Sequence, residues 1–179
     1  MQINRVSDGE LGEQNSAFVV FYTDPVKIYE HVESLPDQVR QLGIPLMGAN
    51  LRWDGSLGFV GGLVDPGETL LQAALREAGE EVGYVPDAKN VVLVCSHHMV
   101  SARRTQNTHL FACRVTMAEI YAIRQRACTA EHGATESAGF NVLHMHAKTL
   151  ENLGKMHWAG TAFNEVNVLL EKGIIAQAA

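Results

Sequence analysis

The chain has 179 residues, of which 46% are hydrophobic and 19% charged, so its composition is that of a globular protein and its length suits one domain over residues 1–179. The formal net charge of −6, from 14 basic and 20 acidic residues, argues against a protein that grips a long nucleic-acid backbone by charge alone. Three cysteines without a C-x-x-C pair argue against a disulfide framework and a cysteine zinc site.

The N-terminal residues are acidic and polar, without the apolar segment of a signal peptide. No apolar run approaches the roughly 20 residues that are needed to span a bilayer. The lack of a disulfide pattern favours a reducing compartment. We therefore expect a soluble cytoplasmic protein without a membrane partner.

The first 60 residues predict strands that are separated by one polar segment. Residues 17–22 are apolar and rich in β-branched and aromatic side chains, which indicates a buried strand. The more polar residues 25–43 predict a helix or an excursion that is broken at Pro36. The remaining features expected here are strands at 45–53 and 57–60, with a tight turn at Asp54 and Gly55 between them.

The rest of the chain predicts both helices and strands. A helix is expected over 69–82, ended by Gly83, and its apolar stripe consists of Leu71, Leu75, Ala78 and Val82. Thr116, with Glu119 three residues later, forms a capping box for a helix that runs to about Cys128. The other expected elements are strands at 91–95, 108–115 and 139–146 and a helix at 160–171. Strands interspersed with helices imply an α/β sandwich.

The helix expected over 69–82 carries three glutamates, Glu77, Glu80 and Glu81. Residues three and four apart share one face of a helix, so we expect these carboxylates to project together, opposite the apolar stripe. Like charges in this arrangement repel each other, and a divalent cation bound among them removes the repulsion. Hard oxygen ligands suit Mg²⁺ or Mn²⁺. The alternative interpretation is a solvated acidic face without a metal.

These glutamates belong to a longer pattern, G-x5-E-x7-R-E-U-x-E-E-x-G-U, in which U is an aliphatic residue. The chain matches the fixed positions with Gly62, Glu68, Arg76, Glu77, Glu80, Glu81 and Gly83. The first and last U positions hold Ala78 and Tyr84, which we assign to packing. The pattern is similar to the Nudix box, and on it the chain is identified as a member of the Nudix hydrolase superfamily. The resemblance implies a single domain with the Nudix fold, an α/β/α sandwich with a mixed central β-sheet.

Other residues of this region have expected mechanical roles. Gly61 and Gly62 let the chain turn tightly and bring a backbone carbonyl toward the metal. Glu68 favours the positive end of the helix and is expected to pair with Arg76 across the loop. Arg76 also stands four residues before Glu80, so we expect it to orient a ligand rather than to touch substrate.

By resemblance, Nudix enzymes hydrolyse a nucleoside diphosphate that is linked to another moiety, and water attacks a phosphorus atom of the pyrophosphate. Mg²⁺ or Mn²⁺ neutralises the phosphate charge and lowers the pKa of the attacking water. The catalytic residues that the resemblance implies are Glu68, Arg76, Glu77, Glu80 and Glu81. The implied metal ligands are the carbonyl of Gly62 and the carboxylates of Glu77, Glu80 and Glu81.

A second resemblance covers residues 47–65, which read MGANLRWDGSLGFVGGLVD. This run is similar to a Nudix branch that contains the small-nucleolar-RNA-decapping enzyme, which is also an inosine diphosphatase. The branch implies a pocket selective for purines such as inosine or xanthosine diphosphate, action on RNA caps, and a homodimer. It also implies nucleotide contacts by Arg52, Phe59 and Phe18. Glu165 stands where the branch has a base-reading glutamine, and a carboxylate there selects donors on the base.

Structural alternatives exist for several of these residues. Phe18 and Phe59 are core residues by default, and Arg52 has the alternative of a surface arginine on a strand. Glu131 and Glu136 are candidates for a site carboxylate outside the box, as general base or metal ligand, against simple loop charge. The predicted substrate-binding set is Phe18, Arg52, Phe59, Gly61, Glu131 and Glu165.

The sequence leaves three functions open. The first is a metal-dependent nucleotide pyrophosphohydrolase that acts on a purine nucleotide or a dinucleotide. The second is removal of RNA caps, against which the acidic net charge weighs. The third, from a different class, is a nucleotide-sensing module without turnover. Such a module is expected to lose a catalytic glutamate, and none is missing here.

Overall fold

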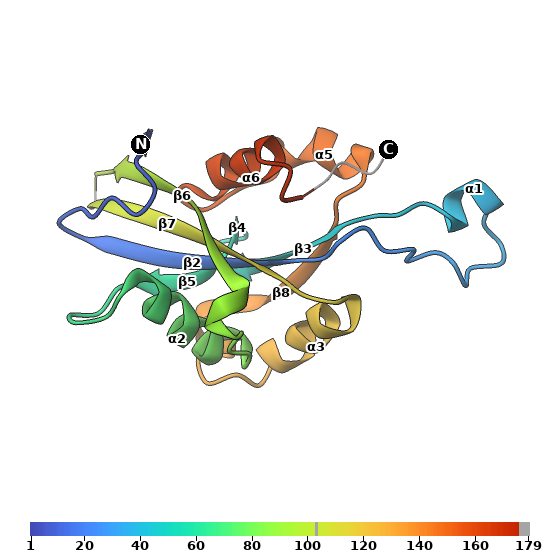
Figure 1. Cartoon of the computed structure of the whole chain (residues 1–179), viewed down its shortest axis with the longest axis horizontal. Coiled ribbons are helices and arrows are strands. Elements are labelled where there is room, and N and C mark those ends of the chain that lie inside the picture. The colour runs from blue at the N-terminus through green and yellow to red at the C-terminus, as the bar shows by residue number, and fades with distance from the viewer. Residues whose placement is uncertain (103, 176–179) are drawn as a thin grey trace.

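The computed structural model describes residues 1–102 and 104–175, and in this part of the chain an eight-stranded sheet has helices on both faces (Figure 1). The strands are β1 Gln2–Val6, β2 Asn15–Tyr22, β3 Leu46–Arg52, β4 Leu57–Gly58, β5 Val60–Leu63, β6 Val91–Val100, β7 Thr105–Arg114 and β8 Ser137–His144. The helices are α1 Asp37–Arg40, α2 Leu70–Val82, the 3-10 helix η1 Ala88–Asn90, α3 Met117–Ala127, α4 Gly133–Glu136, α5 Ala147–Leu153 and α6 Ala162–Glu171.

The sheet is mixed. The strand order is β1-β6-β7-β2-β3-β4, while β5 pairs with β2 and β8 pairs with β3. β2 and β7 run parallel, whereas the other paired strands are antiparallel. Helices α2 and α3 cover one face of the sheet, and α5 and α6 cover the other (Figure 1). The predicted α/β/α sandwich with a mixed central sheet is confirmed.

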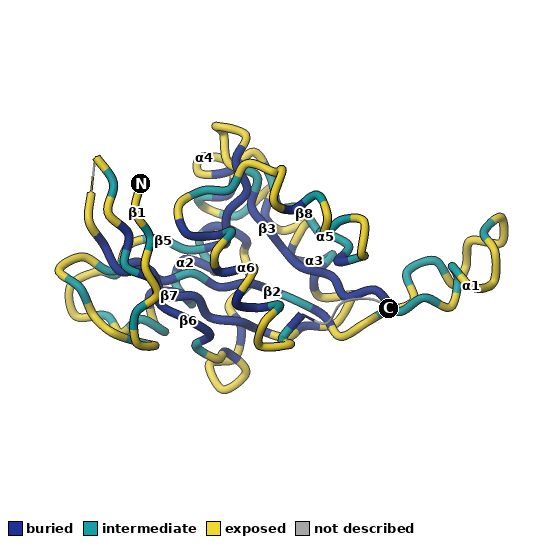
Figure 2. Tube along the Cα trace, turned by 90° about the horizontal axis from the view of Figure 1, so that it is seen from above, coloured by how far each residue is buried: buried dark blue, intermediate teal, exposed yellow. Residues whose placement is uncertain are grey.

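Each face of the sheet has its own apolar core, because successive residues of a strand point to opposite faces. Phe21 of β2 packs in one cluster with Ile120 of α3. Its neighbour Val20 packs in the other cluster with Leu169 of α6. The buried strands therefore run through the middle of the molecule (Figure 2), and the two helical layers lie on either side of them (Figure 1).

Helix α2 is fixed at both ends by its local sequence. The hydroxyl of Thr69 accepts a hydrogen bond from the backbone N–H of Gln72, and the side chain of Gln72 accepts one from the N–H of Thr69. At the other end Gly83 has a φ of 62°, the left-handed conformation that glycine adopts without strain. The predicted helix over 69–82 therefore forms, with Thr69 as its cap.

The face on which the glutamates of α2 lie corrects the sequence prediction. The buried residues of the helix are Ala73, Ala74, Glu77, Ala78, Glu81 and Val82. Glu77 and Glu81 therefore face the sheet, while Leu71 and Leu75 are only half-buried. The expectation that the glutamates project opposite the apolar stripe is wrong, because the small alanines of this face let the helix approach the sheet and cover two carboxylates.

The sequence prediction lacks β1, η1, α4 and α5, and it ends β6 too early. The tight turn expected at Gly61 and Gly62 is wrong, because both residues lie in β5 and pair with β2. β6 continues through the polar residues Ser96, His97 and His98 because partners on β7 satisfy two of these side chains. The hydroxyl of Ser96 lies 2.8 Å from Nδ1 of His109, and Nδ1 of His98 lies 2.7 Å from Oδ1 of Asn107. Hydrophobic periodicity does not detect a strand of this kind, because its buried polar groups pair with one another.

Residues 24–45 form the predicted excursion, which projects from the body of the molecule (Figure 1). Its only helix is α1, a four-residue turn that begins directly after Pro36. A bridge between Val26 and Ile44 joins the two ends of the excursion. No helix in the described part of the chain is long and apolar enough to cross a membrane.

Candidate active site

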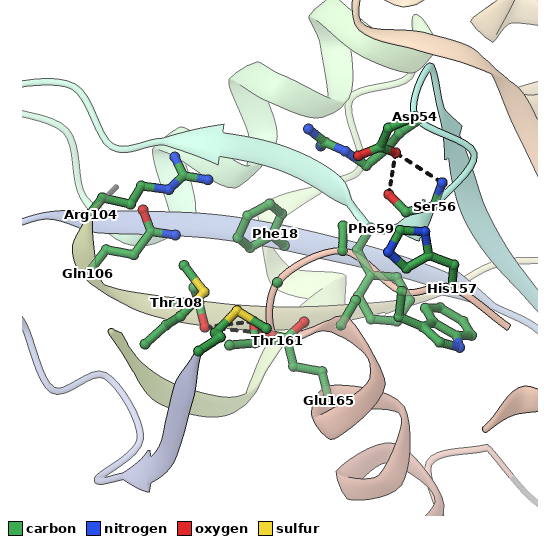
Figure 3. A pocket seen from close by; sticks show the side chains of 18 residues that line it. Phe18, Asp54, Ser56, Phe59, Arg104, Gln106, Thr108, His157, Thr161 and Glu165 are labelled. Carbon is green, nitrogen blue, oxygen red and sulfur yellow. Dashed lines mark hydrogen bonds between the residues drawn. The ribbon is translucent and has the colours of Figure 1, made fainter. Parts of the chain in front are cut away.

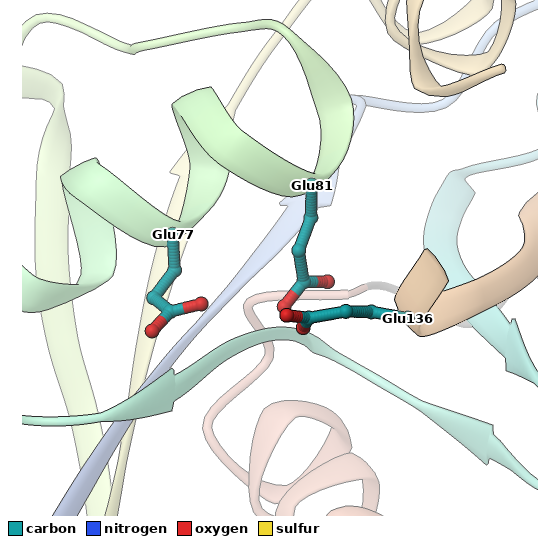
Figure 4. A group of neighbouring side chains, drawn as sticks. All are labelled: Glu77, Glu81 and Glu136. Atoms are coloured by element: carbon teal, nitrogen blue, oxygen red, sulfur yellow. The ribbon is translucent and has the colours of Figure 1, made fainter. Parts of the chain in front are cut away.

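Three carboxylates from two helices meet beside the sheet (Figure 4). Glu77 and Glu81 come from α2 and Glu136 from α4, and one oxygen of each lies within 4.8 Å of the others. Glu77 and Glu81 are buried, whereas Glu136 is exposed. The cluster therefore has a buried side formed by α2 and an accessible side formed by α4.

The buried carboxylates are electrostatically strained. Burial raises the pKa of Glu81 to about 8, although the backbone N–H of Gly61 donates to its Oε1 over 3.1 Å. The charges of Glu77 and Glu136 act in the same direction as burial, and the side-chain amide of Asn50, which donates to Oε2, acts against it. Burial also raises the pKa of Glu77. A proton or a cation is needed to stabilise like charges at this separation.

The residues around the cluster fit a divalent cation of the Mg²⁺ or Mn²⁺ type. All donors are hard carboxylate oxygens, which these ions prefer. A Cβ at Gly62 would lie 2.5 Å from Oε1 of Glu77, so glycine is required for β5 to pass this close to the cluster. Within residues 1–102 and 104–175, the buried Oδ1 of Asn50 lacks a hydrogen-bond partner, which leaves a further oxygen acceptor next to Glu81.

Arg76 donates hydrogen bonds to three glutamates of the Nudix box. Its Nε donates to Glu68 over 2.9 Å, and its Nη1 donates to Glu77 over 2.9 Å and to Glu80 over 3.0 Å. The predicted pairing of Glu68 with Arg76 is confirmed, and it raises the pKa of Arg76. Glu80 lies outside the three-carboxylate cluster, between Arg76 and Nδ1 of His132 at 3.5 Å. Its role as a metal ligand stays a prediction.

Helix α4 brings Glu136 to the cluster because its start docks on the end of α2. The N–H of His132 donates to the carbonyl of Glu80 over 2.8 Å. Gly133 packs so closely that a Cβ there would overlap the carbonyl oxygen of Ala127 and lie 2.9 Å from that of Glu81. The backbones of α2 and α3 together therefore determine where Glu136 stands.

We expect Gly133→Ala to destabilise the protein by about 1–3 kcal/mol, the usual cost of extra atoms in a close-packed site. Chemical denaturation measures the free energy of unfolding. Gly154→Ala is the matched control, because its backbone is helical and a Cβ there would meet only the ring of Phe163 at 3.4 Å. Equal free energies of unfolding for the two variants would contradict the docking of α4 on α2.

A pocket of about 350 Å³ lies on the α6 side of the sheet (Figure 3), a volume that suits a small ligand. Four residues of the predicted substrate-binding set line it, namely Phe18, Arg52, Phe59 and Glu165. A fifth, Gly61, pairs with Phe18 across β5 and β2. Glu131 is exposed and is not part of the lining in the described structure.

Glu165 forms the buried end of this pocket. Oε1 of its carboxyl accepts hydrogen bonds from the hydroxyls of Thr161 at 2.8 Å and Thr108 at 3.3 Å. Burial raises the pKa of Glu165 to about 7, and the two hydroxyls act in the opposite direction. Near neutral pH the carboxyl therefore offers the pocket either a proton or a negative charge.

Cationic side chains line the pocket as well. Arg52 and Arg104 both belong to its lining. Among the residues that the structure describes, neither guanidinium group makes a hydrogen bond or a salt bridge, although the charge of Arg52 acts on Asp54 in the same lining. Unpaired guanidinium groups beside a cavity suit the binding of phosphate.

Two links of the backbone connect the pocket with the carboxylate cluster. Gly61 donates to Glu81 on one side of β5 and pairs with Phe18 of the pocket through β2. Arg52 of the pocket pairs with Ser137, the residue that follows Glu136. The pocket lining and the cluster are thus joined through neighbouring residues of β2, β3, β5 and β8.

Sequence reasoning missed Asn50, Thr108 and Thr161. Asn50 carried a usable signal, because it is a single polar residue in the apolar strand run that precedes Arg52. The two threonines carried none, since their role arises only from contact with Glu165 across the fold. Glu136 was one of two carboxylates that the sequence left open, and the structure places it, rather than Glu131, in the cluster.

The mixed sheet, the capped glutamate helix and the carboxylate cluster together define a Nudix hydrolase fold. The Nudix domain of Shewanella oneidensis NrtR, solved in complex with ADP ribose, is similar, with a TM-score of 0.60 over 90% of this chain and 88% of that one. The two sequences are 17% identical, so this likeness shows the fold alone.

The family within this superfamily follows from the sequence comparisons. The family described as Nudt16-like, U8 snoRNA-decapping enzyme-like, matches residues 15–154, and the chain belongs to it. The U8 snoRNA-decapping enzyme of Homalodisca vitripennis is 38% identical over 92 residues, which are 50% of this chain and 48% of the relative. That of Mus musculus is 35% identical over 111 residues, 58% and 56% of the two chains. The chain thus spans about half the length of the curated relatives it matches.

Proposed function

We propose that the chain is a Mg²⁺- or Mn²⁺-dependent pyrophosphohydrolase that cleaves a phosphoanhydride bond of a purine nucleotide or a dinucleotide by attack of water at phosphorus. The observation that carries the proposal is the meeting of Glu77, Glu81 and Glu136 within 4.8 Å. These carboxylates would hold the cation, together with the carbonyl of Gly62 and with Glu80. When bound, the cation neutralises phosphate charge and activates water for attack.

Other residues of the site would position the metal ligands and bind the substrate. Glu68 and Arg76 hold Glu77 in place through the hydrogen bonds of the guanidinium group. Arg52 supplies an unpaired positive charge for a phosphate oxygen at the pocket. Phe18 and Phe59 form apolar walls against which a purine ring packs.

Glu165 is suited to reading the base. An ionised carboxylate only accepts hydrogen bonds, and 6-oxopurines such as hypoxanthine, xanthine and guanine present an N1–H donor to it. Adenine presents an acceptor at the same ring position. Because Oε1 already accepts from Thr161 and Thr108, Oε2 is the atom left for the base. This arrangement supports inosine or xanthosine diphosphate as substrate.

We expect Glu165→Leu to lower kcat/KM for inosine diphosphate about tenfold more than for adenosine diphosphate, since one base-reading hydrogen bond is lost. The variant is expected to fold, because the hydroxyls of Thr108 and Thr161 lie 3.0 Å apart and can pair with each other. Steady-state kinetics on both nucleotides measure the ratio. An unchanged ratio would show that Glu165 does not read the base.

A substrate panel tests the proposed function itself. Nucleoside diphosphates, dinucleotides, sugar nucleotides and capped RNA are incubated with Mg²⁺ or Mn²⁺, and the products are identified. We expect metal-dependent release of a nucleoside monophosphate from a purine substrate. Binding without hydrolysis of any member of the panel would instead support a nucleotide-sensing module.

RNA decapping is the second candidate function, because the two curated relatives are named U8 snoRNA-decapping enzymes. Capped RNA presents the same phosphoanhydride linkage to the cluster. The net charge of −6 weighs against strong binding along an RNA backbone.

We also propose that the protein forms a homodimer and is located in the cytoplasm. Sedimentation equilibrium tests the homodimer, and cell fractionation tests the location.

A further inference from the structure

Trp53 is an exposed tryptophan at the edge of the active site. Its side chain is 66% exposed. Every phenylalanine and tyrosine ring in the described residues, and the other tryptophan, is buried or half-buried. A single exposed apolar residue is common on protein surfaces, so the significance of Trp53 depends on its place beside the site and on how its ring is held.

The orientation of this indole is fixed. Nε1 of Trp53 donates to the carbonyl oxygen of Thr135 over 3.2 Å. The ring is thus held by its polar edge, while none of the ring-to-ring contacts of the described residues involves it. A held ring with accessible surface loses little conformational entropy when a second ring stacks on it.

Trp53 also stands between the two parts of the site. Its neighbours Arg52 and Asp54 line the pocket. Its hydrogen-bond partner Thr135 directly precedes Glu136 of the carboxylate cluster. Trp53 is thus adjacent in the chain to residues of the pocket lining, and its hydrogen bond joins it to the residue before a carboxylate of the cluster.

We propose that Trp53 is a stacking platform for a second nucleobase, the one on the far side of the pyrophosphate from the nucleoside in the pocket. The inference rests on the proposed function and narrows its substrate class to compounds whose second moiety is also a nucleoside. Free dinucleoside polyphosphates and RNA caps share this chemistry. Stacking of a base on an aromatic side chain changes affinity by a factor of about 5 to 150.

The test compares inosine diphosphate, which lacks a second base, with a diinosine polyphosphate and a capped RNA oligonucleotide. For Trp53→Ala we expect the ratio of kcat/KM for the dinucleoside to that for inosine diphosphate to fall at least fivefold. Trp53→Phe keeps a ring and should retain most of the ratio. Val92→Ala is the matched control, because Val92 is 64% exposed on β6 and should leave the ratio unchanged.

The outcomes separate the inference from alternatives. An equal loss for both substrates would overturn it and assign Trp53 to holding the turn before Glu136. An unchanged ratio would overturn it as well. A fall for capped RNA alone would assign the platform to caps, and a fall for both would assign it to nucleosides in general.

Fluorescence keeps the inference testable if no substrate is turned over. The chain has two tryptophans, and Trp53→Phe leaves Trp158, which lines the pocket and reports on the first nucleoside. At equal protein concentrations, we expect the dinucleoside to remove more emission intensity from the wild-type protein than from Trp53→Phe, and inosine diphosphate to remove the same intensity from both. Equal quenching of the two proteins by the dinucleoside would refute stacking, whereas failure of hydrolysis alone would refute only the proposed function.

Discussion

Glu81→Gln is expected to reduce metal-dependent turnover at least about a hundredfold and, at the same time, to raise the melting temperature of the metal-free protein. Turnover is expected to fall because mutation of a residue that only supports a metal ligand lowers metal affinity or activity by about 10- to 100-fold. Mutation of the ligand itself should lower activity by at least as much. The gain in stability follows from the buried charge, since burial raises the pKa of Glu81 to about 8.

The pH dependence of this gain has a definite sign. The folded state holds the proton of Glu81 up to a pH of about 8, whereas the unfolded chain releases it near the ordinary glutamate pKa of 4.5. Between these values the folded state binds more protons, so the free energy of unfolding of the metal-free wild type falls as the pH rises. Glutamine does not ionise, and the variant should therefore gain stability over the wild type across this window.

The structure can accommodate the amide of Glu81→Gln. The N–H of Gly61 still finds an oxygen acceptor, and a turned-over amide of Asn50 presents its Oδ1, which has no partner in the described structure, to the new N–H₂ group. We expect a rise of at least about 2–4 °C, which corresponds to about 1 kcal/mol for a chain of this length. Differential scanning calorimetry at pH 5 and pH 8 measures it, with the exposed Glu171→Gln as control for net charge.

Added Mn²⁺ provides the complementary measurement. A ligand that binds only the folded state raises its stability, so Mn²⁺ should raise the melting temperature of the wild type and much less that of Glu81→Gln. If Glu81→Gln retained full turnover, or if Mn²⁺ stabilised both proteins equally, Glu81 would not belong to the cation site.

The Nudix box predicted the bounds of α2 correctly, because the residues that begin and end this helix lie within or next to it. Thr69, Gln72 and Gly83 cap the helix through contacts within a few residues, and such contacts are legible in a linear pattern. The burial of Glu77 and Glu81 could not be predicted from the sequence, because charged residues ordinarily lie on the exposed face of a helix. Here the glutamates of the site lie on the buried face instead. The small alanines of that face leave room for them, and Arg76 donates a hydrogen bond to Glu77.

Glu136 shows the opposite limit of sequence reasoning. It belongs to a four-residue helix without a side-chain cap, and only its docking against the carbonyl of Glu80 and beneath that of Glu81 places it in the site. Contacts of this kind join residues about fifty positions apart and leave no periodic pattern. Two neighbouring carboxylates, Glu131 and Glu136, therefore look equivalent in the sequence.

A matched pair of variants, Glu136→Gln and Glu131→Gln, tests which of the two carboxylates belongs to the site. Glu136 shares the cluster with Glu77 and Glu81, whereas Glu131 is exposed outside it. We expect Glu136→Gln to lower kcat by about 10- to 100-fold and to raise the Mn²⁺ concentration at half-maximal activity. Glu131→Gln, which removes the same charge five residues earlier, should stay within about twofold of the wild type.

Stability does not confound this comparison. Glu131 is exposed away from the cluster, where substitutions usually change the free energy of unfolding by less than about 0.5 kcal/mol. Glu136→Gln removes a like charge beside Glu77 and Glu81, which favours the metal-free folded state, so unfolding would not account for a loss of its activity. Kinetics at several Mn²⁺ concentrations then separate the two roles, because weakened metal binding is relieved at high Mn²⁺ while a lost general base is not. Full activity of Glu136→Gln, together with loss in Glu131→Gln, would reverse the assignment and require the turn before α4 to move toward the cluster in the complex with substrate.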